Sequence, residues 1–205
     1  MTPTKLYVFP PSPNSRKVMI VNNSTGLNLP VETIDLMAGE QAAEDFLVKN
    51  RNGKVPVLEF DDLSTLWESN VIMNRLAGHA RSDLWPADNS RYEILRWQFW
   101  EACHWTPACN PFISRHQFGD ETIDLNAAAE SFHRFARVLN DHLQGRDWLA
   151  GDAVTTADIA VGAVLYLRDQ CRYPLAEYSH INDWVSRIEA LDASAAVDRV
   201  LQAAA

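Results

Sequence analysis

Two serines stand at predicted helix starts, where a hydroxyl can act on an anion. Ser12 comes just ahead of a helix predicted to begin near residue 14, and Ser69 opens another over about 69–80. The first N–H groups of a helix have no partner within it, so a hydroxyl beside them suits a bound anion. Glu68 precedes Ser69 and can pair with an amine. An ordinary helix cap is the competing interpretation of this Glu-Ser pair.

The elements that position these residues alternate between strand and helix over the first 80 residues. Strands are predicted at about 6–9, 31–36, 55–60 and 64–67, and helices at about 14–26, 41–49 and 69–80. The initial βαβ unit predicts a parallel pair, and the Asp61-Asp62 turn predicts an antiparallel hairpin. The result is a mixed four-stranded sheet with helices against it. Pro56 interrupts the third strand, and a cis peptide there would hold the preceding backbone open to a ligand.

Residues 81–90 are polar and irregular and form the predicted linker. The linker separates an α/β domain of residues 1–80 from an all-helical domain of residues 91–205. The helices of the second domain are predicted at about 91–105, 125–143, 159–167, 180–191 and 194–203. The first of them must kink or stop near Pro107.

The helix over 159–167 is apolar nearly all round, which is typical of a fully buried helix. Thr155 and Asp158, just ahead of it, have the spacing of a capping box, in which each side chain satisfies a backbone N–H of the other residue. Val154 and Ile159 supply the matching hydrophobic staple. These residues are predicted to stabilise the helix and to take no part in chemistry.

Composition narrows the classes of function. The net charge of −9 comes with no basic cluster, which argues against nucleic acid as a partner. No apolar run approaches the ~20 residues needed to span a membrane, and no apolar signal region opens the chain, so we expect a cytoplasmic protein. Cys103, Cys109 and Cys171 contain no C-x-x-C pair and are predicted to be reduced, buried thiols. No Cys, His and Asp/Glu set has metal-ligand spacing, so no metal is expected.

Four motifs resemble, in order and in separation, those of the cytosolic glutathione S-transferases, with an active-site loop of the serine type found in bacterial members. They are Ser12-Pro13-Asn14-Ser15-Arg16-Lys17-Val18, Asn50-Arg51-Asn52-Gly53-Lys54-Val55-Pro56-Val57-Leu58, Trp67-Glu68-Ser69-Asn70, and Leu149-Ala150-Gly151-Asp152 with Thr155-Thr156-Ala157-Asp158. The resemblance covers nearly the whole chain. It implies a thioredoxin-like first domain that binds glutathione, an all-α second domain that binds the acceptor substrate, and a homodimer.

The resemblance assigns glutathione contacts to five residues of the first domain. Ser69 would hold the carboxylate of the γ-glutamyl arm, and Glu68 the adjacent amine. Val55, before a cis Pro56, would offer its N–H and C=O to the cysteinyl backbone in the manner of an added strand. Lys54 would reach a carboxylate.

Ser12 occupies the position of the catalytic hydroxyl in serine-type members. Lowering a thiol pKa of ~8.5 by about two units requires ~2.7 kcal/mol of preference for the thiolate. A hydrogen bond to a charged acceptor supplies roughly 1.5–3 kcal/mol, and a helix N-terminus adds about 0.3–1 kcal/mol. One hydroxyl and one helix end therefore suffice without a general base.

Neighbouring residues leave alternatives open. Asn14 stands where some bacterial relatives with a Thr-Pro-Asn loop use asparagine to hold the thiol, so Ser12 and Asn14 compete for the role. Ser15 is interpreted as a helix cap. Tyr7 lies within the first strand and is interpreted as a core or wall residue, although other branches of the family use an N-terminal tyrosine. The loop lacks the cysteine of members that form mixed disulfides with glutathione.

An aromatic acceptor pocket is expected along the first long helix of the second domain, and in the family it lies between the domains. Its candidate residues are Trp100, His104, Trp105, Phe112 and Arg115. Core packing is the alternative for each residue alone, whereas together they suit a bulky apolar electrophile. His104 is a further candidate for an acid or hydrogen-bond donor to substrate.

The leading hypothesis is a glutathione transferase that conjugates the glutathione thiolate to hydrophobic electrophiles. One alternative is a glutathione-dependent disulfide reductase or peroxidase, which the Ser12-Pro13-Asn14 loop suggests. Another is a non-catalytic adaptor that keeps the fold for protein binding. The loop contains no cysteine or arginine that favours a ring-opening isomerase or a dehalogenase.

Overall fold

The protein is described by a computed structural model over residues 1–203, with side chains through residue 200. Its internal contacts divide it into two compact units. The first comprises Met1–Pro86 with the segment from Leu191 onward, and the second comprises Ala87–Ala190. Within the described residues, no helix is long and apolar enough to cross a membrane.

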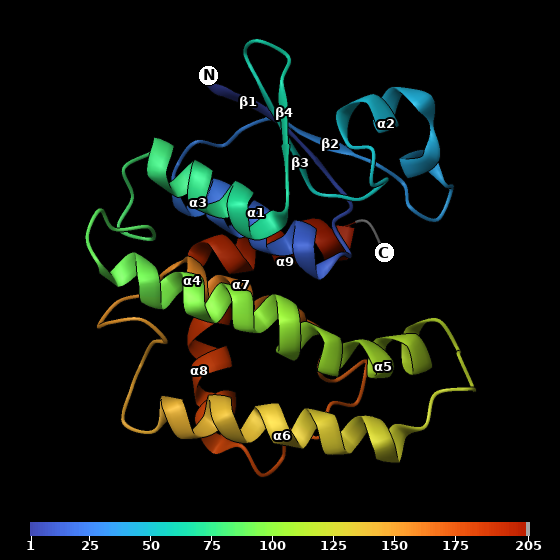
Figure 1. Ribbon diagram of the computed structural model, residues 1–205, viewed down its shortest axis with the longest axis vertical. Helices are drawn as coiled ribbons and strands as arrows, with labels where there is room; N and C mark the ends of the chain where they lie inside the picture. The colour runs from blue at the N-terminus through green and yellow to red at the C-terminus, as the bar shows by residue number, and fades with distance from the viewer. Residues whose placement is uncertain (204–205) are drawn as a thin grey trace. The chain divides into compact units, whose positions relative to one another are not determined.

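The first unit is built on a mixed four-stranded sheet (Figure 1). Its strands are β1 (Pro3–Val8), β2 (Val31–Thr33), β3 (Val57–Phe60) and β4 (Thr65–Trp67), in the spatial order β2-β1-β3-β4. Strands β1 and β2 run parallel, whereas β3 is antiparallel to both β1 and β4. The predicted fold class, sheet and hairpin are therefore confirmed.

Helices cover the two faces of this sheet. They are α1 (Pro13–Ser24), α2 (Glu44–Lys49) after a 3₁₀ turn at Glu40–Ala42, α3 (Ser69–His79) and α9 (Asp192–Ala203). Tyr7 and Val57 are partners across β1 and β3, and both pack in a cluster with Phe46 of α2. Since side chains alternate along a strand, Leu6 and Leu58 face the opposite side, where α1 packs against α3 and α9 (Figure 1).

The segment from Leu191 belongs by its contacts to the first unit, whereas the sequence analysis grouped it with the helical domain. The reason is that α9 packs against α1. Arg16 of α1 is buried and forms an ion pair with Asp198 of α9. This pair joins residues that lie 182 positions apart in the sequence.

The second unit is helical throughout. Its elements are α4 (Ser90–Trp100), a π turn at Glu101–Trp105, α5 (Thr106–Gln117), α6 (Leu125–Leu143), α7 (Thr156–Gly162), a 3₁₀ turn at Ala163–Leu167 and α8 (Ser179–Glu189). One face of α6 is buried at Phe132, Ala136, Leu139 and Leu143, while Phe135 is half-buried.

A stop or kink was expected near Pro107, and the structure has a wider, π-helical turn just before it. The helical path continues from α4 through the π turn into α5, and Pro107 lies in the first turn of α5. A proline lacks the N–H that an earlier carbonyl needs in an α-helix. The N–H of Thr106 donates to the carbonyl of Glu101, five residues earlier, so hydrogen bonding is displaced by one residue just ahead of the proline.

Asp158 organises the start of α7. Its Oδ1 accepts hydrogen bonds from the Leu149 N–H at 2.8 Å and the Trp184 indole N–H at 3.0 Å. Its Oδ2 accepts from the N–H of Thr155 at 2.9 Å and from the Thr155 hydroxyl at 3.1 Å. Burial raises the pKa of Asp158, and these four donors oppose that rise. The predicted capping box is confirmed, and the same carboxylate also holds α8 and the loop before α7.

We expect Asp158→Ala to lower the free energy of unfolding by about 3 kcal/mol, because it leaves several buried donors without an acceptor. Denaturant unfolding followed by circular dichroism measures the change. Asp152→Ala is the matched control, because Asp152 is exposed in the preceding loop, and its effect should stay within about 0.5 kcal/mol. Equal effects of the two substitutions would contradict the organising role of Asp158.

Candidate functional site

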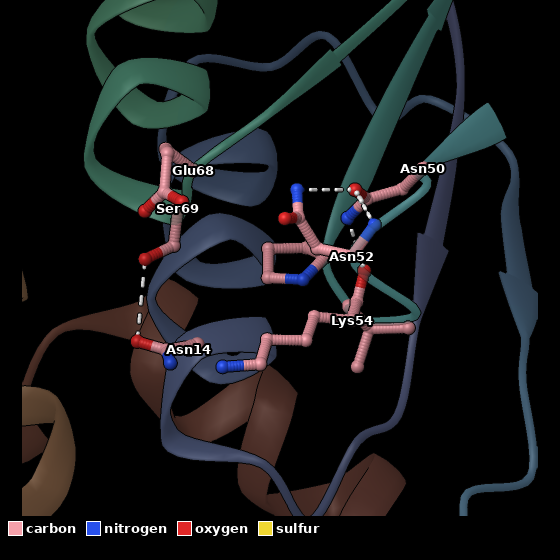
Figure 2. A pocket seen from close by; sticks show the side chains of 8 residues that line it. Asn14, Asn50, Asn52, Lys54, Glu68 and Ser69 are labelled. Carbon is pink, nitrogen blue, oxygen red and sulfur yellow. Dashed lines mark hydrogen bonds between the residues drawn. The ribbon is translucent and has the colours of Figure 1, made fainter. Parts of the chain in front are cut away.

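A polar pocket in the first unit joins three separate segments of the chain. Of the described residues, eight line it: Asn14, Asn50, Asn52, Lys54, Val55, Pro56, Glu68 and Ser69. Figure 2 shows Asn14 and Ser69 on one side of the pocket and the segment that contains Asn50 and Asn52 on the other. The structure thus brings together all five residues to which a glutathione contact was assigned, and it adds Asn14, Asn50 and Asn52.

Two helix N-termini reach this pocket. Asn14 lies in the first turn of α1, and Ser69 is the first residue of α3. The Ser69 hydroxyl donates to Asn14 Oδ1 at 3.2 Å, which ties the two helix starts together (Figure 2). Since each helix start carries partial positive charge and unpaired N–H groups, this side of the pocket favours an anion.

Glu68 makes the whole connection between β4 and α3. Its backbone has φ 73° and ψ 109°, a region that residues other than glycine rarely occupy and that costs about 1–3 kcal/mol. The residue is exposed at the rim of the pocket, while Ser69 beside it is only 8% exposed. A carboxylate and a sheltered hydroxyl therefore stand next to each other, as recognition of an amine and a carboxylate would require.

Asn50 fixes the opposite wall. Its buried side chain donates to the Lys54 carbonyl at 2.7 Å. Its Oδ1 accepts from both the backbone N–H of Asn52 at 3.0 Å and the side-chain amide of Asn52 at 2.9 Å. The Gly53 N–H also donates to the Asn50 carbonyl at 2.9 Å. The segment from Asn50 to Lys54 is thus a closed loop whose shape depends on one amide.

The loop leads directly into a cis peptide between Val55 and Pro56, as the sequence suggested. Pairing of β3 with β1 begins only at Val57, so the Val55 backbone lies outside the ladder of the sheet. The exposed Lys54 side chain comes from this wall and extends toward Asn14 (Figure 2), while the exposed Glu68 lines the same pocket. The pocket therefore offers a cation, a carboxylate, two helix starts and a free strand end to one ligand.

Ser12 occupies the N-cap position of α1 and is half-buried. Its N–H donates to the Phe9 carbonyl at 2.8 Å, and its carbonyl accepts from the Arg16 N–H at 2.9 Å. Ser12 is not among the eight residues that line the described pocket, whereas its competitor Asn14 is. Ser15 is not a cap, because it lies inside α1 and its hydroxyl accepts from the Phe9 N–H at 3.0 Å.

Comparisons with known proteins agree with this geometry. Residues 2–78 match the family "Glutathione S-transferase, N-terminal domain", and residues 99–192 match "Glutathione S-transferase, C-terminal domain". Glutathione S-transferase 3 of Zea mays is 32% identical over 203 residues, which cover 93% of this chain and 90% of the relative. The chain belongs to the glutathione S-transferase family.

Two further proteins are similar to this chain over most of its length. The crystal structure of a glutathione S-transferase from Pseudomonas fluorescens Pf-5 superimposes with a TM-score of 0.85 at 29% identity, covering 92% of this chain and 96% of that one. Disulfide-bond oxidoreductase YfcG of Escherichia coli K12 is 26% identical over 196 residues, which cover 91% of this chain and 90% of the relative. The family uses glutathione as its substrate, so the pocket of the first unit is the candidate glutathione-binding site of this chain.

Tyr7, which other branches of the family use, is a core residue here. It is 3% exposed, packs against Phe46 and Val57, and donates its hydroxyl proton to Glu59 Oε2 at 2.9 Å. This confirms the sequence interpretation of Tyr7.

Two of the five acceptor-pocket candidates belong to the core of the helical unit. Trp105 is 0% exposed and Phe112 is 4% exposed. Both rings pack against Phe132, with centroid separations of 5.0 Å and 5.5 Å, and the Trp105 indole N–H donates to the Val161 carbonyl at 3.2 Å. Their apolar character reflects this packing, so the assignment of these two residues to an open pocket is wrong.

The other three candidates have different surroundings. Trp100 lines a mainly apolar groove between α4 and α6, together with Arg96, Trp97, Val138 and His142. His104 is exposed and stacks on Phe135 with a centroid separation of 5.1 Å. Arg115 is half-buried, and its guanidinium lies 4.0 Å from the Glu121 carboxylate.

Two pocket residues, Asn50 and Asn52, were quoted within a motif but given no role by the sequence analysis. The available signal was their place in a turn, Asn50-Arg51-Asn52-Gly53, directly before Val55. Asparagine side chains readily bond to backbone two residues further on, which is the contact seen between Asn50 and Asn52. No group of three or more potential metal ligands occurs among the described residues.

The cysteines differ in exposure. Cys109 and Cys171 are buried, as predicted, whereas Cys103 is exposed, so the prediction of a buried thiol fails there. Burial raises the pKa of both the Cys109 and the Cys171 thiol. Both buried thiols are therefore protonated at neutral pH.

We expect a thiol reagent to modify one cysteine, Cys103, in the native protein at pH 7–8. The buried thiols are shielded and lack the reactive thiolate, so all three should react only after denaturation. A colorimetric thiol titration with and without denaturant measures this. Cys103→Ser should abolish the native reaction, and its persistence would contradict the burial of the other two.

Asn50→Ala should destabilise the protein by about 1.5 kcal/mol, because it removes the three hydrogen bonds of a buried side chain. It should also weaken glutathione binding, since Lys54 and Val55 lose their fixed positions. Asn52→Ala is the matched comparison, because it removes only one side-chain bond and should cost less than half as much. Denaturant unfolding and calorimetric titration with glutathione provide the two measurements.

Proposed function

We propose that the protein is a glutathione transferase that conjugates the glutathione thiolate to hydrophobic electrophiles. The observation that carries this proposal is the single pocket formed by Lys54, Val55, Pro56, Glu68 and Ser69. These residues come from two separate segments, and their chemistry complements the carboxylates, the amine and the backbone of a γ-glutamyl tripeptide.

In the proposed complex, the γ-glutamyl carboxylate accepts from the Ser69 hydroxyl and the N–H groups that open α3. The α-amine beside it pairs with Glu68. The cysteinyl backbone adds to the Val55 backbone as a short extra strand, since that residue lies outside the ladder of the sheet. Lys54 neutralises the glycyl carboxylate. In this complex the γ-glutamyl carboxylate replaces Asn14 Oδ1 as the acceptor of the Ser69 hydroxyl.

This placement directs the thiol toward the start of α1. The thiol loses its proton to solvent, and the Ser12 hydroxyl donates a hydrogen bond to the resulting thiolate. The sulfur then uses an electron pair to form a bond to the carbon of the electrophile, and the leaving group departs with its bonding pair. Ser12 at the N-cap and the N-terminus of α1 together lower the free energy of the thiolate.

The electrophile is assigned to the helical unit, where Trp100 and His104 remain exposed or partly exposed for aromatic contact. Arg115 remains a further candidate. A homodimer, a cytoplasmic location and the absence of a nucleic-acid partner complete the proposal. The homodimer rests on family membership, and the exclusion of nucleic acid rests on the net charge of −9.

The second candidate is a glutathione-dependent disulfide reductase or peroxidase. It is favoured by Asn14, which lines the pocket and bonds to Ser69, whereas Ser12 does not line it. A relative that carries the name disulfide-bond oxidoreductase is 26% identical. In this case Asn14 would hold the thiolate, and the electron acceptor would be a small disulfide or a peroxide. A non-catalytic adaptor would bind no glutathione at millimolar concentration.

Substitution of the two competing residues separates the activities. Ser12→Ala should lower kcat for a chromogenic aryl halide by about 10- to 100-fold and raise the pKa of bound glutathione, because it removes a hydrogen bond to a charged acceptor. Asn14→Ala should have the smaller effect. Ser24→Ala is the control, because Ser24 is exposed at the far end of α1.

The opposite ranking would favour the reductase, particularly if a small disulfide were turned over faster than the aryl halide. Full activity of the Ser12 variant with an unchanged thiol pKa would contradict the role of Ser12. Calorimetric titration without binding up to millimolar glutathione would contradict both enzymatic proposals.

A further inference from the structure

A charged cluster lies on the face of the sheet covered by α2. Tyr7 of β1, Lys49 of α2 and Glu59 of β3 meet there. Glu59 Oε2 accepts from the Tyr7 hydroxyl at 2.9 Å and from the Lys49 ammonium at 2.8 Å. The same ammonium lies 4.6 Å from the centroid of the Tyr7 ring, within the range of a cation–π contact. The three side chains thus contact one another pairwise.

This cluster anchors the end of α2, and Phe46 of the same helix packs in a core cluster with Tyr7 and Val57. The helix has six residues, and Phe46 is its buried residue. Lys49 is the last residue of α2, and its carbonyl accepts from the Thr65 hydroxyl of β4 at 2.7 Å. Lys49 is therefore held by side chains from β1, β3 and β4. A six-residue helix is too short to be stable by itself, so its position depends on these contacts.

The anchored residue is followed directly by the wall of the pocket. Asn50 comes next in the chain, and its side chain shapes the loop as far as the Lys54 carbonyl. Five of the eight lining residues lie between Asn50 and Pro56. A displacement of Lys49 would therefore be passed through one peptide bond to the residue that closes the loop. Glu59 itself is not one of the described residues that line the pocket.

The cluster is an ion pair in a partly sheltered position. The Lys49 side chain is 29% exposed and that of Glu59 is 13% exposed. The hydrogen bond between them raises the pKa of Lys49 and lowers that of Glu59, so both groups are charged at neutral pH. Lys5 adds a second ammonium 5.6 Å from the Tyr7 ring, but its own partner is Glu32 at 3.1 Å. Lys5 and Glu32 lie on the sheet and are not part of α2.

We propose that Glu59 is a positioning residue for glutathione binding, which acts by holding Lys49 and thereby the loop from Asn50 to Pro56. The inference rests on the proposed glutathione site and extends it to a residue outside the pocket. Glu59 fixes a backbone position and has no part in the thiol chemistry. Its loss should therefore weaken ground-state binding of glutathione and leave turnover at saturating glutathione nearly unchanged.

Glu59→Gln is the informative variant, because it keeps an oxygen for the Tyr7 hydroxyl and removes the charge that holds Lys49. We expect the Kd for glutathione in calorimetry and the KM for glutathione in turnover to rise about five-fold. The value of kcat should change by less than about two-fold. Glu32→Gln is the matched control, because it removes the other ion pair of this sheet and should leave both constants unchanged.

A double-mutant cycle tests whether Glu59 acts through Lys49. Lys49→Met should weaken glutathione binding to a similar degree, and the double variant should be no worse than either single one. Lys49→Arg, in contrast to Lys49→Met, should keep an affinity for glutathione near that of the wild type, because it keeps a cation within reach of the Glu59 carboxylate. Additive effects of the two single substitutions would overturn the proposed route.

The outcomes separate this inference from the proposed function. If the wild type binds glutathione and Glu59→Gln binds it equally well, the positioning role is wrong and the glutathione site stands. A loss of kcat with an unchanged KM would also overturn the inference, since it would place Glu59 in the chemical step. If the wild type binds no glutathione, the proposed function fails and the inference fails with it.

Discussion

The buried amide of Asn50 is the constraint on which the candidate site depends. Its three hydrogen bonds close the loop from Asn50 to Lys54 and present Lys54 and Val55 at fixed positions. A buried amide is costly unless it is bonded, so each alternative shape of the loop that breaks these bonds is disfavoured. The opposite wall needs no such device, because two helix starts, joined by Ser69 and Asn14, form it. A pocket with one rigid loop and one helical wall results.

The helical unit uses the same principle at Asp158. A carboxylate buried among apolar side chains is unfavourable, yet four donors converge on it from the loop before α7, from its N-cap and from α8. These donors specify how α7 and α8 are joined. Apolar packing among Trp105, Phe112 and Phe132 fills the core of the unit, but packing of this kind tolerates several arrangements. The polar contact selects one of them.

Local signals in the sequence predicted most of the fold. The order of strands and helices, the hairpin and the capping box follow from turn residues, caps and periodicity. The cis Val55–Pro56 peptide was suggested by a proline inside a predicted strand and by the resemblance of its loop. The five residues to which a glutathione contact was assigned lie in two separate motifs, and the structure brings both motifs to one pocket. The packing of α9 on α1 and the burial of Trp105 and Phe112 could not be read in this way. An aromatic residue has the same identity in a core as in a pocket, and only its neighbours in space distinguish the two positions.

The ion pair between Arg16 and Asp198 joins two helices that are synthesised at widely separated times. The first unit is discontinuous, because its supporting helix α9 is synthesised after the whole helical unit. Arg16 of α1 therefore cannot acquire its Asp198 partner until 182 further residues have been added to the chain. The first unit is thus completed only after the helical unit has been synthesised, and a fragment cut after Pro86 is missing one of its own structural parts.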